Sequence, residues 1–142
     1  MSESISKLMI QDHIELFSIL SKIGETSVDA PQQFREFRDR LSSHIALEEQ
    51  VIFSPQNVSG ELEEQARRMK EEHVFIVDLL RSLERHIDSG AVELVVSDFI
   101  PVLDEHRKFE EQFLYPSLER IVDEKSRRLI FLELKRRLPT VS

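Results

Sequence analysis

The sequence contains no cysteine. A chain without cysteine forms no disulfide, no iron–sulfur cluster and no thiolate zinc site, and it has no thiol nucleophile. Any metal ion that binds this protein must therefore be held by imidazole and carboxylate groups. Five histidines and 27 acidic residues carry these groups.

Long apolar runs and an excess of basic residues are also missing. No segment approaches the roughly 18 consecutive apolar residues of a membrane-spanning helix. The first residues, MSESISKLMIQDH, lack the basic flank and apolar stretch of a signal peptide. The net charge of −8 argues against nucleic acid, whose phosphates require clustered lysine and arginine. We therefore expect a soluble, cytoplasmic protein with neither a membrane nor a nucleic-acid partner.

Glycine and proline are scarce, with three and five copies respectively. So few turn-forming residues predict that most of the chain is helical, and no sustained alternation of polar and apolar residues predicts a strand. With 142 residues, of which 40% are hydrophobic, the chain suits one core and hence a single domain over residues 1–142.

Five helices are predicted from the apolar periodicity and from the positions of the few prolines and glycines. Pro101 is expected to kink the fourth helix, and Pro116 is expected to end it. Short links between long amphipathic helices favour antiparallel neighbours. The predicted fold class is all-α, an antiparallel up-down-up-down four-helix bundle with a short C-terminal capping helix. The predicted helices cover about residues 4–23, 31–54, 61–90, 92–115 and 124–138.

One motif occurs twice. Residues 44–53 read HIALEEQVIF and residues 106–115 read HRKFEEQFLY. Each copy spells His-x-x-x-Glu-Glu-Gln followed by two large apolar residues and an aromatic ring. An acidic residue and a histidine precede each copy at a similar distance, as Asp12-His13 and as Glu72-His73. This repetition indicates a duplicated helical hairpin.

The spacing of the motif places its polar residues on one face. His44 and Glu48 are four residues apart, as are His106 and Glu110, so each pair lies on one helical face about one turn apart. The histidines that precede the two copies lie near the middle of the first and third helices, and mid-helix positions of an antiparallel bundle share one depth. We therefore predict that six residues converge in the core: His13, His44, Glu48, His73, His106 and Glu110.

The same residues also have a purely structural interpretation. A single mid-helix histidine is more often hydrogen-bonded or on the surface than a metal ligand, and a lone His-x-x-x-Glu pair is common on exposed helices. Six polar groups without partners in an apolar interior, however, would destabilise the fold by several kcal/mol. We therefore predict a shared metal site. Burial of these faces is predicted from the apolar residues on or beside them: Met9, Leu16, Leu41, Leu47, Val51, Met69, Ile76, Leu103, Phe113 and Leu114.

The remaining histidine and two repeated acids have other interpretations. His86 comes thirteen residues after His73, so it points to about the opposite side of the helix from His73, and it lies in the last turn. There an imidazole complements the helix dipole, so we assign it a structural role. Glu49 and Glu111 lie about 100° around the helix from the proposed ligands. They either orient the ligands or are solvated, and we favour solvation.

The donor set bears on the identity of the metal. Six nitrogen and oxygen donors exceed the four of a tetrahedral zinc site and suit two ions bridged by carboxylates. Imidazole and carboxylate ligands with open positions favour iron, with manganese or a mixed pair as the alternative. In the simplest arrangement His13 and His44 serve one ion, His73 and His106 serve the other, and Glu48 and Glu110 bridge both.

At these residues the sequence resembles the hemerythrin family, in particular its HHE cation-binding branch. The family pattern is His, His-x-x-x-Glu, His, His-x-x-x-Glu on four successive helices, and the match extends from about Met9 to Pro116. The resemblance implies an antiparallel bundle with an oxo- or hydroxo-bridged, non-haem di-iron centre.

The sequence departs from the oxygen-carrying members of that family. These have a further histidine four residues after the third-helix histidine, where this chain has Val77. They end with His-x-x-x-x-Asp, whereas Glu110 comes one residue sooner. Reversible oxygen carriage is therefore not expected. The set of four histidines and two glutamates is similar to that of the iron-centre repair proteins of nitrosative stress, but those carry an additional N-terminal domain with cysteine.

The sequence leaves several functions open. The first is a metal-binding protein whose di-iron centre binds or reacts with a small oxidant, such as dioxygen, nitric oxide or peroxide. The second is iron sensing or buffering, in which metal loading is coupled to folding, or iron-centre repair under stress. The third is a structural bundle with a vestigial metal site. No catalytic residue and no protein partner can be named from the sequence.

Overall fold

The computed structural model describes residues 4–23, 30–54, 60–86 and 92–139, and within these ranges every regular element is a helix. No helix there is both long enough and apolar enough to cross a membrane. The all-helical prediction is thereby confirmed. Gly24, Pro55 and Gly90, which lie at or just beyond the ends of the predicted helices, are outside the described residues, as is the side chain of His86. The elements are α1 (Ile5–Lys22), α2 (Ala30–Leu47), η2 (Glu48–Ile52), α3 (Glu61–His86), α4 (Val92–Phe109), η4 (Glu110–Leu114), α5 (Tyr115–Ile121) and α6 (Glu124–Arg137).

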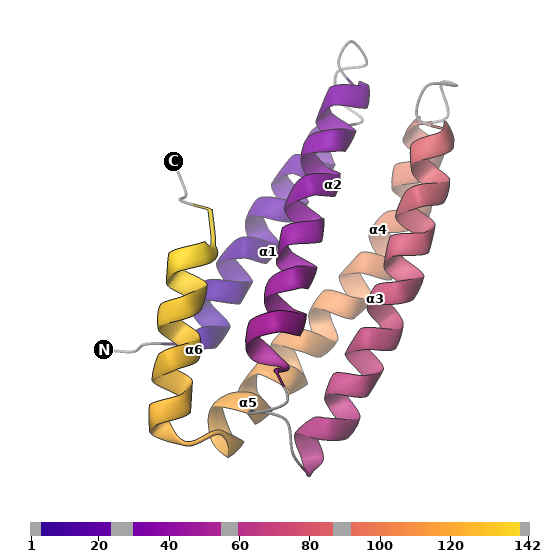
Figure 1. The fold of residues 1–142 in the computed structure, drawn as a ribbon. Helices are drawn as coiled ribbons and strands as arrows, with labels where there is room; N and C mark the ends of the chain where they lie inside the picture. The colour runs from indigo at the N-terminus through magenta and orange to yellow at the C-terminus, as the bar shows by residue number, and fades with distance from the viewer. Residues whose placement is uncertain (1–3, 24–29, 55–59, 87–91, 140–142) are drawn as a thin grey trace.

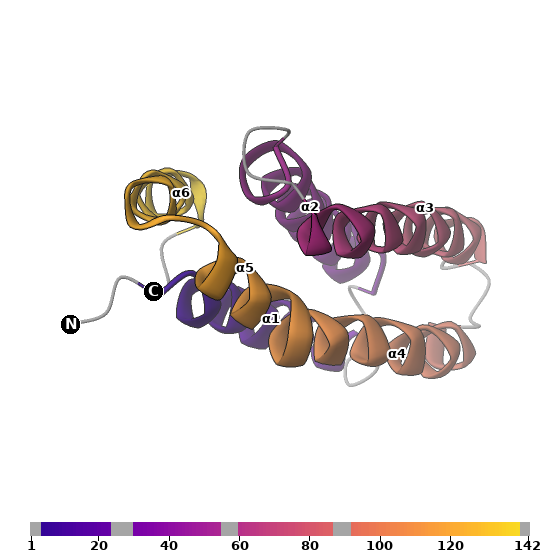
Figure 2. The ribbon, with the colours of Figure 1, turned by 90° about the horizontal axis from the view of Figure 1, so that it is seen from below.

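The helices form two hairpins. Figure 1 shows the chain ascending along α1, descending along α2, ascending along α3 and descending along α4. In the view along the helices, α1 and α4 make one layer and α2 and α3 make the other (Figure 2). The last helix, α6, lies outside these layers, where it contacts α1 and η2. Four long helices from different parts of the sequence thus surround one interior.

Local sequence signals explain where the helices begin. The side chain of Ser4 accepts a hydrogen bond from Lys7 N and caps α1, and Asp123 does the same for Ser126 N at the start of α6. Gly60 adopts a positive φ of 54° just before α3, which a residue without Cβ tolerates best. Three acidic side chains then occupy the first turn of α3, where they complement the helix dipole.

Two apolar clusters fill the interior, one toward each end of the bundle. Each of the four long helices passes from one cluster to the other at its histidine: in α1, for example, Met9 belongs to the first cluster, Leu16 to the second, and His13 lies between them. A polar layer is thus enclosed between two apolar ones. The first cluster includes Ile5, Met9, Leu47, Met69, Leu114 and Leu134, and the second includes Leu16, Phe37, Leu41, Ile76, Phe99 and Leu103.

Two short π-helical turns interrupt the regular helix, and each begins at one of the repeated glutamates. The backbone N–H of Phe53 donates to the carbonyl of Glu48, and that of Tyr115 donates to the carbonyl of Glu110. These i→i+5 hydrogen bonds add one residue to the turn. Both copies of the Glu-Glu-Gln motif therefore carry the same irregularity, which α-helical periodicity does not predict.

The second π turn explains two wrong predictions. We expected Pro116 to end the fourth helix, but α5 follows η4 directly and Pro116 is its second residue. We also placed Phe113 beside the predicted site, yet 56% of this residue is exposed, because the extra residue in the turn changes the direction of the side chains that follow Glu110. Pro101 lies inside α4, which continues across it.

The packing of α6 generates a prediction about stability. Leu134 is fully buried in the first apolar cluster with Met9 and Ile52. We expect Leu134→Ala to lower the free energy of unfolding by about 2–5 kcal/mol, because it leaves a cavity. Leu132, on the same helix, is 48% exposed, and Leu132→Ala should change stability by less than about 0.5 kcal/mol. Urea denaturation followed by circular dichroism measures both, and equal effects would contradict the docking of α6.

Candidate metal centre

The structure brings all six predicted residues into one buried layer, and each is at most 7% exposed. Their nitrogen and oxygen atoms form two groups, and within each group the atoms lie within 4.8 Å of one another. Glu48 and Glu110 belong to both groups. The first group adds His13 and His44, and the second adds His73 and His106. Such a buried cluster could hold metal ions.

Glu110 turns one carboxylate oxygen toward each pair of imidazoles. Its Oε1 lies 3.0 Å from His13 Nε2 and 3.9 Å from His44 Nε2. Its Oε2 lies 3.0 Å from His106 Nε2 and 3.8 Å from His73 Nε2. The carboxylate therefore stands between the two groups, with one oxygen available to each.

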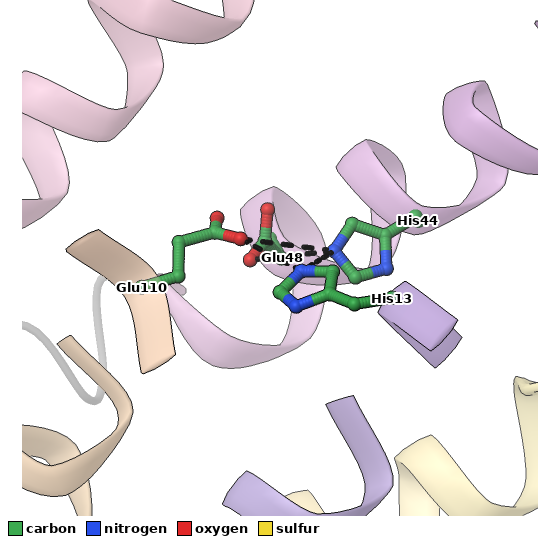
Figure 3. Close-up of side chains that lie close together, drawn as sticks. All are labelled: His13, His44, Glu48 and Glu110. Carbon is green, nitrogen blue, oxygen red and sulfur yellow. Dashed lines mark hydrogen bonds and ion pairs between the residues drawn. The ribbon is translucent and has the colours of Figure 1, made fainter. Parts of the chain in front are cut away.

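Glu48 is arranged in the same way. Its Oε1 lies 3.0 Å from His73 Nε2, and its Oε2 lies 3.7 Å from His44 Nε2. Figure 3 shows the two carboxylates meeting in front of the imidazoles of His13 and His44. Both glutamates begin a π turn. The duplicated motif therefore places two equivalent carboxylates close together, one from each hairpin.

Each imidazole also contacts a carboxylate on its outer side. Since an ionised carboxylate only accepts hydrogen bonds, Nδ1–H of the histidine is the donor. With Nδ1–H directed outward, Nε2 is the ring nitrogen that faces the centre of the cluster, which is how metal-ligating histidines are commonly oriented. The four hydrogen bonds are His13 to Glu111 (2.6 Å), His44 to Asp12 (2.7 Å), His73 to Glu49 (2.8 Å) and His106 to Glu72 (2.8 Å).

These contacts overturn the preference for solvated Glu49 and Glu111. The offset of about 100° points each side chain at the neighbouring helix rather than at water. Glu49 reaches α3 and Glu111 reaches α1. Asp12 and Glu72 were recognised in the sequence only as parts of the repeat. One sequence signal identifies all four acids. Each directly precedes or follows a proposed ligand in the sequence, and this arrangement is the same in both copies of the hairpin.

Arginines hold three of the four outer carboxylates. Arg40 donates to Asp12 (3.0 Å), Arg68 to Glu72 (2.8 Å) and Arg107 to Glu111 (2.9 Å). Burial alone would raise the pKa of Asp12, but the hydrogen bonds and charges of His44 and Arg40 outweigh it and place that pKa below its usual value. The pKa values of Glu72 and Glu111 are also lowered, so these three arginine-paired carboxylates are anionic acceptors at neutral pH.

Tyr115 is the residue of this layer that sequence reasoning missed. Its hydroxyl donates to Glu48 Oε2 at 2.6 Å and lies 3.1 Å from Glu110 Oε1. In a regular α-helix Tyr115 would lie about 140° around the axis from Glu110, and the π turn brings it back onto the same face. Burial, together with the two carboxylates, raises the pKa of Tyr115 well above its usual value, so the phenol keeps its proton.

Two features test whether the residues fit a metal ion. Glu110 Oε2 is buried without a hydrogen-bond partner, although His106 Nε2 is 3.0 Å away, and a buried anionic oxygen of this kind requires a positive charge. The inward atoms of the six residues are all nitrogen or oxygen, which suits iron or manganese. The residues therefore fit a divalent cation in each group.

A small cavity of about 10 Å³ adjoins the cluster, roughly the space of one water molecule. Its polar side consists of three of the four imidazoles together with a shared carboxylate, and its other walls are mainly apolar. The site thus opens inward onto the second apolar cluster. The cavity is lined by His13, Leu16, Phe17, Leu41, His44, Ile45, Ile76, Leu103, His106, Arg107 and Glu110.

The proton equilibria of the cluster predict how the metal-free protein responds to pH. Burial lowers the pKa of His73, but Glu110 and Glu48 outweigh burial and raise it from 6.5 to about 10. A pKa raised by folding contributes stability that is complete below about pH 6.5 and is lost as the pH rises toward 10. The thermal midpoint of protein stripped by a chelator should therefore fall between pH 6.5 and pH 9.5.

The matched variant is His73→Gln, whose side chain does not titrate. It should show a smaller loss of thermal midpoint over the same pH interval. The other three histidines of the layer also have raised pKa values, so part of the dependence should persist. An identical slope in the two proteins would show that His73 does not hold its proton in the folded state.

Comparison with known proteins agrees with this geometry. A family model described as Hemerythrin HHE cation binding domain matches residues 4–118, which include all six inward residues, the four outer carboxylates and Tyr115. No match is found among curated proteins or among solved structures. The resemblance seen in the sequence is confirmed, and the chain belongs to the hemerythrin family as an HHE cation-binding domain.

Proposed function

We propose that this protein binds two iron ions in an antiparallel four-helix bundle and uses them to bind or react with a small oxidant. His13 and His44 would hold one ion, His73 and His106 the other, and Glu48 and Glu110 would be shared. The observation that carries the proposal is that each buried glutamate presents one oxygen to each imidazole pair. A single ion would leave half of these atoms without a partner.

The donor set favours iron, with manganese or a mixed pair as the alternative. Imidazole and carboxylate ligands without thiolate suit these metals. When bound, such a metal supplies an electron donor or acceptor and a coordination position for a small ligand. The two negative charges of the buried carboxylates of Glu48 and Glu110 would offset half of the positive charge of two divalent ions.

The chain itself determines what can reach the site. Leu16, Leu41 and Leu103 form part of the apolar wall of the adjoining cavity, and all three are buried. The small volume favours a molecule of two non-hydrogen atoms, such as dioxygen, nitric oxide or peroxide, over larger substrates. The buried cluster is closed to large molecules, so we expect neither nucleic acid nor lipid as a ligand. We also expect the protein to act in the cytoplasm.

A second candidate function is iron sensing or buffering. The observation that favours it is the complete burial of Glu48 and Glu110, because the empty site leaves two anions in an apolar interior and metal binding then contributes to folding. A sensor should lose much of its thermal stability when iron is removed. A protein that reacts with an oxidant should keep its folded site in both states.

Metal analysis combined with optical spectroscopy tests the proposal. Protein from iron-replete cells should contain about two iron ions per chain, the number of ion positions in the proposed site, and the spectrum should change on addition of dioxygen, peroxide or nitric oxide. The double variant Glu48→Gln/Glu110→Gln removes both shared carboxylates and should bind little iron. Fully helical wild-type protein without iron or manganese would overturn the proposal.

The outer carboxylates give a second test. Glu72→Gln replaces the acceptor of His106 Nδ1 with a weaker one and should reduce Fe(II) affinity about 10- to 100-fold. The neighbouring residue supplies the control, because Glu71 pairs with Arg67 on the surface and Glu71→Gln should leave affinity unchanged. Competition with a chromophoric chelator under anaerobic conditions measures both constants. Equal affinities for the two variants would contradict the role of the outer hydrogen bond.

A further inference from the structure

The two halves of the metal layer are not equivalent, and one difference between them is a hydroxyl group beside the shared carboxylates. Tyr115 is fully buried, and its hydroxyl contacts Glu48 Oε2 and Glu110 Oε1. These oxygens are the ones that face the first imidazole pair: Glu48 Oε2 lies 3.7 Å from His44 Nε2, and Glu110 Oε1 lies 3.0 Å from His13 Nε2. The ring of Tyr115 also stacks on that of His13, with centroids 6.0 Å apart.

The second imidazole pair has no such neighbour among the described residues. Phe53 occupies the equivalent position in the first copy of the motif, is buried, and carries no hydroxyl. The oxygen of Glu110 that faces His73 and His106 lies 3.0 Å from His106 Nε2 and has no hydroxyl beside it among the described residues. The duplication therefore preserves the ligands but not the hydroxyl group.

A hydroxyl that donates to a ligand oxygen alters that oxygen as a metal donor. Its proton carries partial positive charge and competes with a cation for the same lone pairs, so the oxygen donates less electron density to the ion. Both oxygens near the phenol belong to the His13/His44 position. Those of the His73/His106 position contact imidazole nitrogens but no hydroxyl among the described residues: Glu48 Oε1 lies 3.0 Å from His73 Nε2, and Glu110 Oε2 lies 3.0 Å from His106 Nε2.

We propose that Tyr115 makes the two metal positions unequal, so that the position between His73 and His106 fills first and the position between His13 and His44 fills second. Tyr115 acts through Glu48 and Glu110 and is thus a positioning residue. The inference rests on the proposed function, because it requires that two ions bind. It adds an order of loading and names the atom that sets this order.

Anaerobic titration of the metal-free protein with Fe(II), in competition with a chromophoric chelator, tests the proposal. The wild type should bind two ions with dissociation constants that differ about tenfold or more, the range over which an outer hydrogen bond changes metal affinity. Tyr115→Phe removes only the hydroxyl and reproduces the residue of the first copy. Its two constants should lie within about threefold of each other.

A merely structural role of Tyr115 gives a different result. Loosening of the core would weaken both positions together and leave the ratio of the two constants unchanged in Tyr115→Phe, and this outcome would overturn the proposal. The thermal midpoint of the variant, measured without metal, reports such loosening separately. The ratio of constants is the readout that a packing defect does not move.

Two single-ligand variants identify which position fills first without any change at Tyr115. His13→Gln should retain the tighter step, whereas His73→Gln should abolish it. The reverse result would overturn the proposed order. Two ions bound with equal constants by the wild type would refute this inference alone, whereas failure to bind any metal would refute the proposed function as well.

Discussion

The structure is organised around two carboxylates that water cannot reach. Glu48 and Glu110 are fully buried between two apolar clusters, a position where an isolated anion is strongly unfavourable. The surrounding groups compensate in layers of alternating charge. Imidazoles surround the carboxylates, acidic side chains accept from the imidazoles, and arginines pair with three of those acids. Each layer stabilises the opposite charge of the layer inside it.

The same contacts hold the helices together. Asp12 on α1 accepts from α2, Glu49 on η2 from α3, Glu72 on α3 from α4, and Glu111 on η4 from α1. The four hydrogen bonds therefore run once around the bundle and close on the first helix. Because each of these bonds joins an imidazole to a neighbouring helix, loss of one acceptor would disturb both the orientation of an imidazole and a contact between helices. Site and fold share the same interactions.

Much of this arrangement is predictable from the sequence because it depends on α-helical spacing. The four-residue interval between His44 and Glu48, repeated at His106 and Glu110, is enough to place each pair on one face. One group of features that was not predicted results from the π turns. One additional residue in a turn changes the direction of every later side chain, which is why the exposure of Phe113, the continuation past Pro116 and the approach of Tyr115 differ from expectation.

The outer carboxylates escaped prediction for another reason. Their role depends on which helices are neighbours, and a single helix cannot reveal that. Glu111 would face solvent if η4 stood alone, and it contacts His13 only because α1 lies beside it. The sequence did show that each acid is next to a ligand in both copies of the hairpin. Which imidazole the acid contacts could be inferred only once the order of the helices was known.

The pairing of Phe53 with Tyr115 has a consequence for the architecture itself. Two identical hairpins assembled as a homodimer would be related by a rotation axis, and that axis would place a phenol at both positions or at neither. A covalent connection between the hairpins removes this restriction, so each half can acquire its own substitutions. The single chain can thus surround two chemically identical ions with different electrostatic environments, which a symmetric pair of shorter chains could not do.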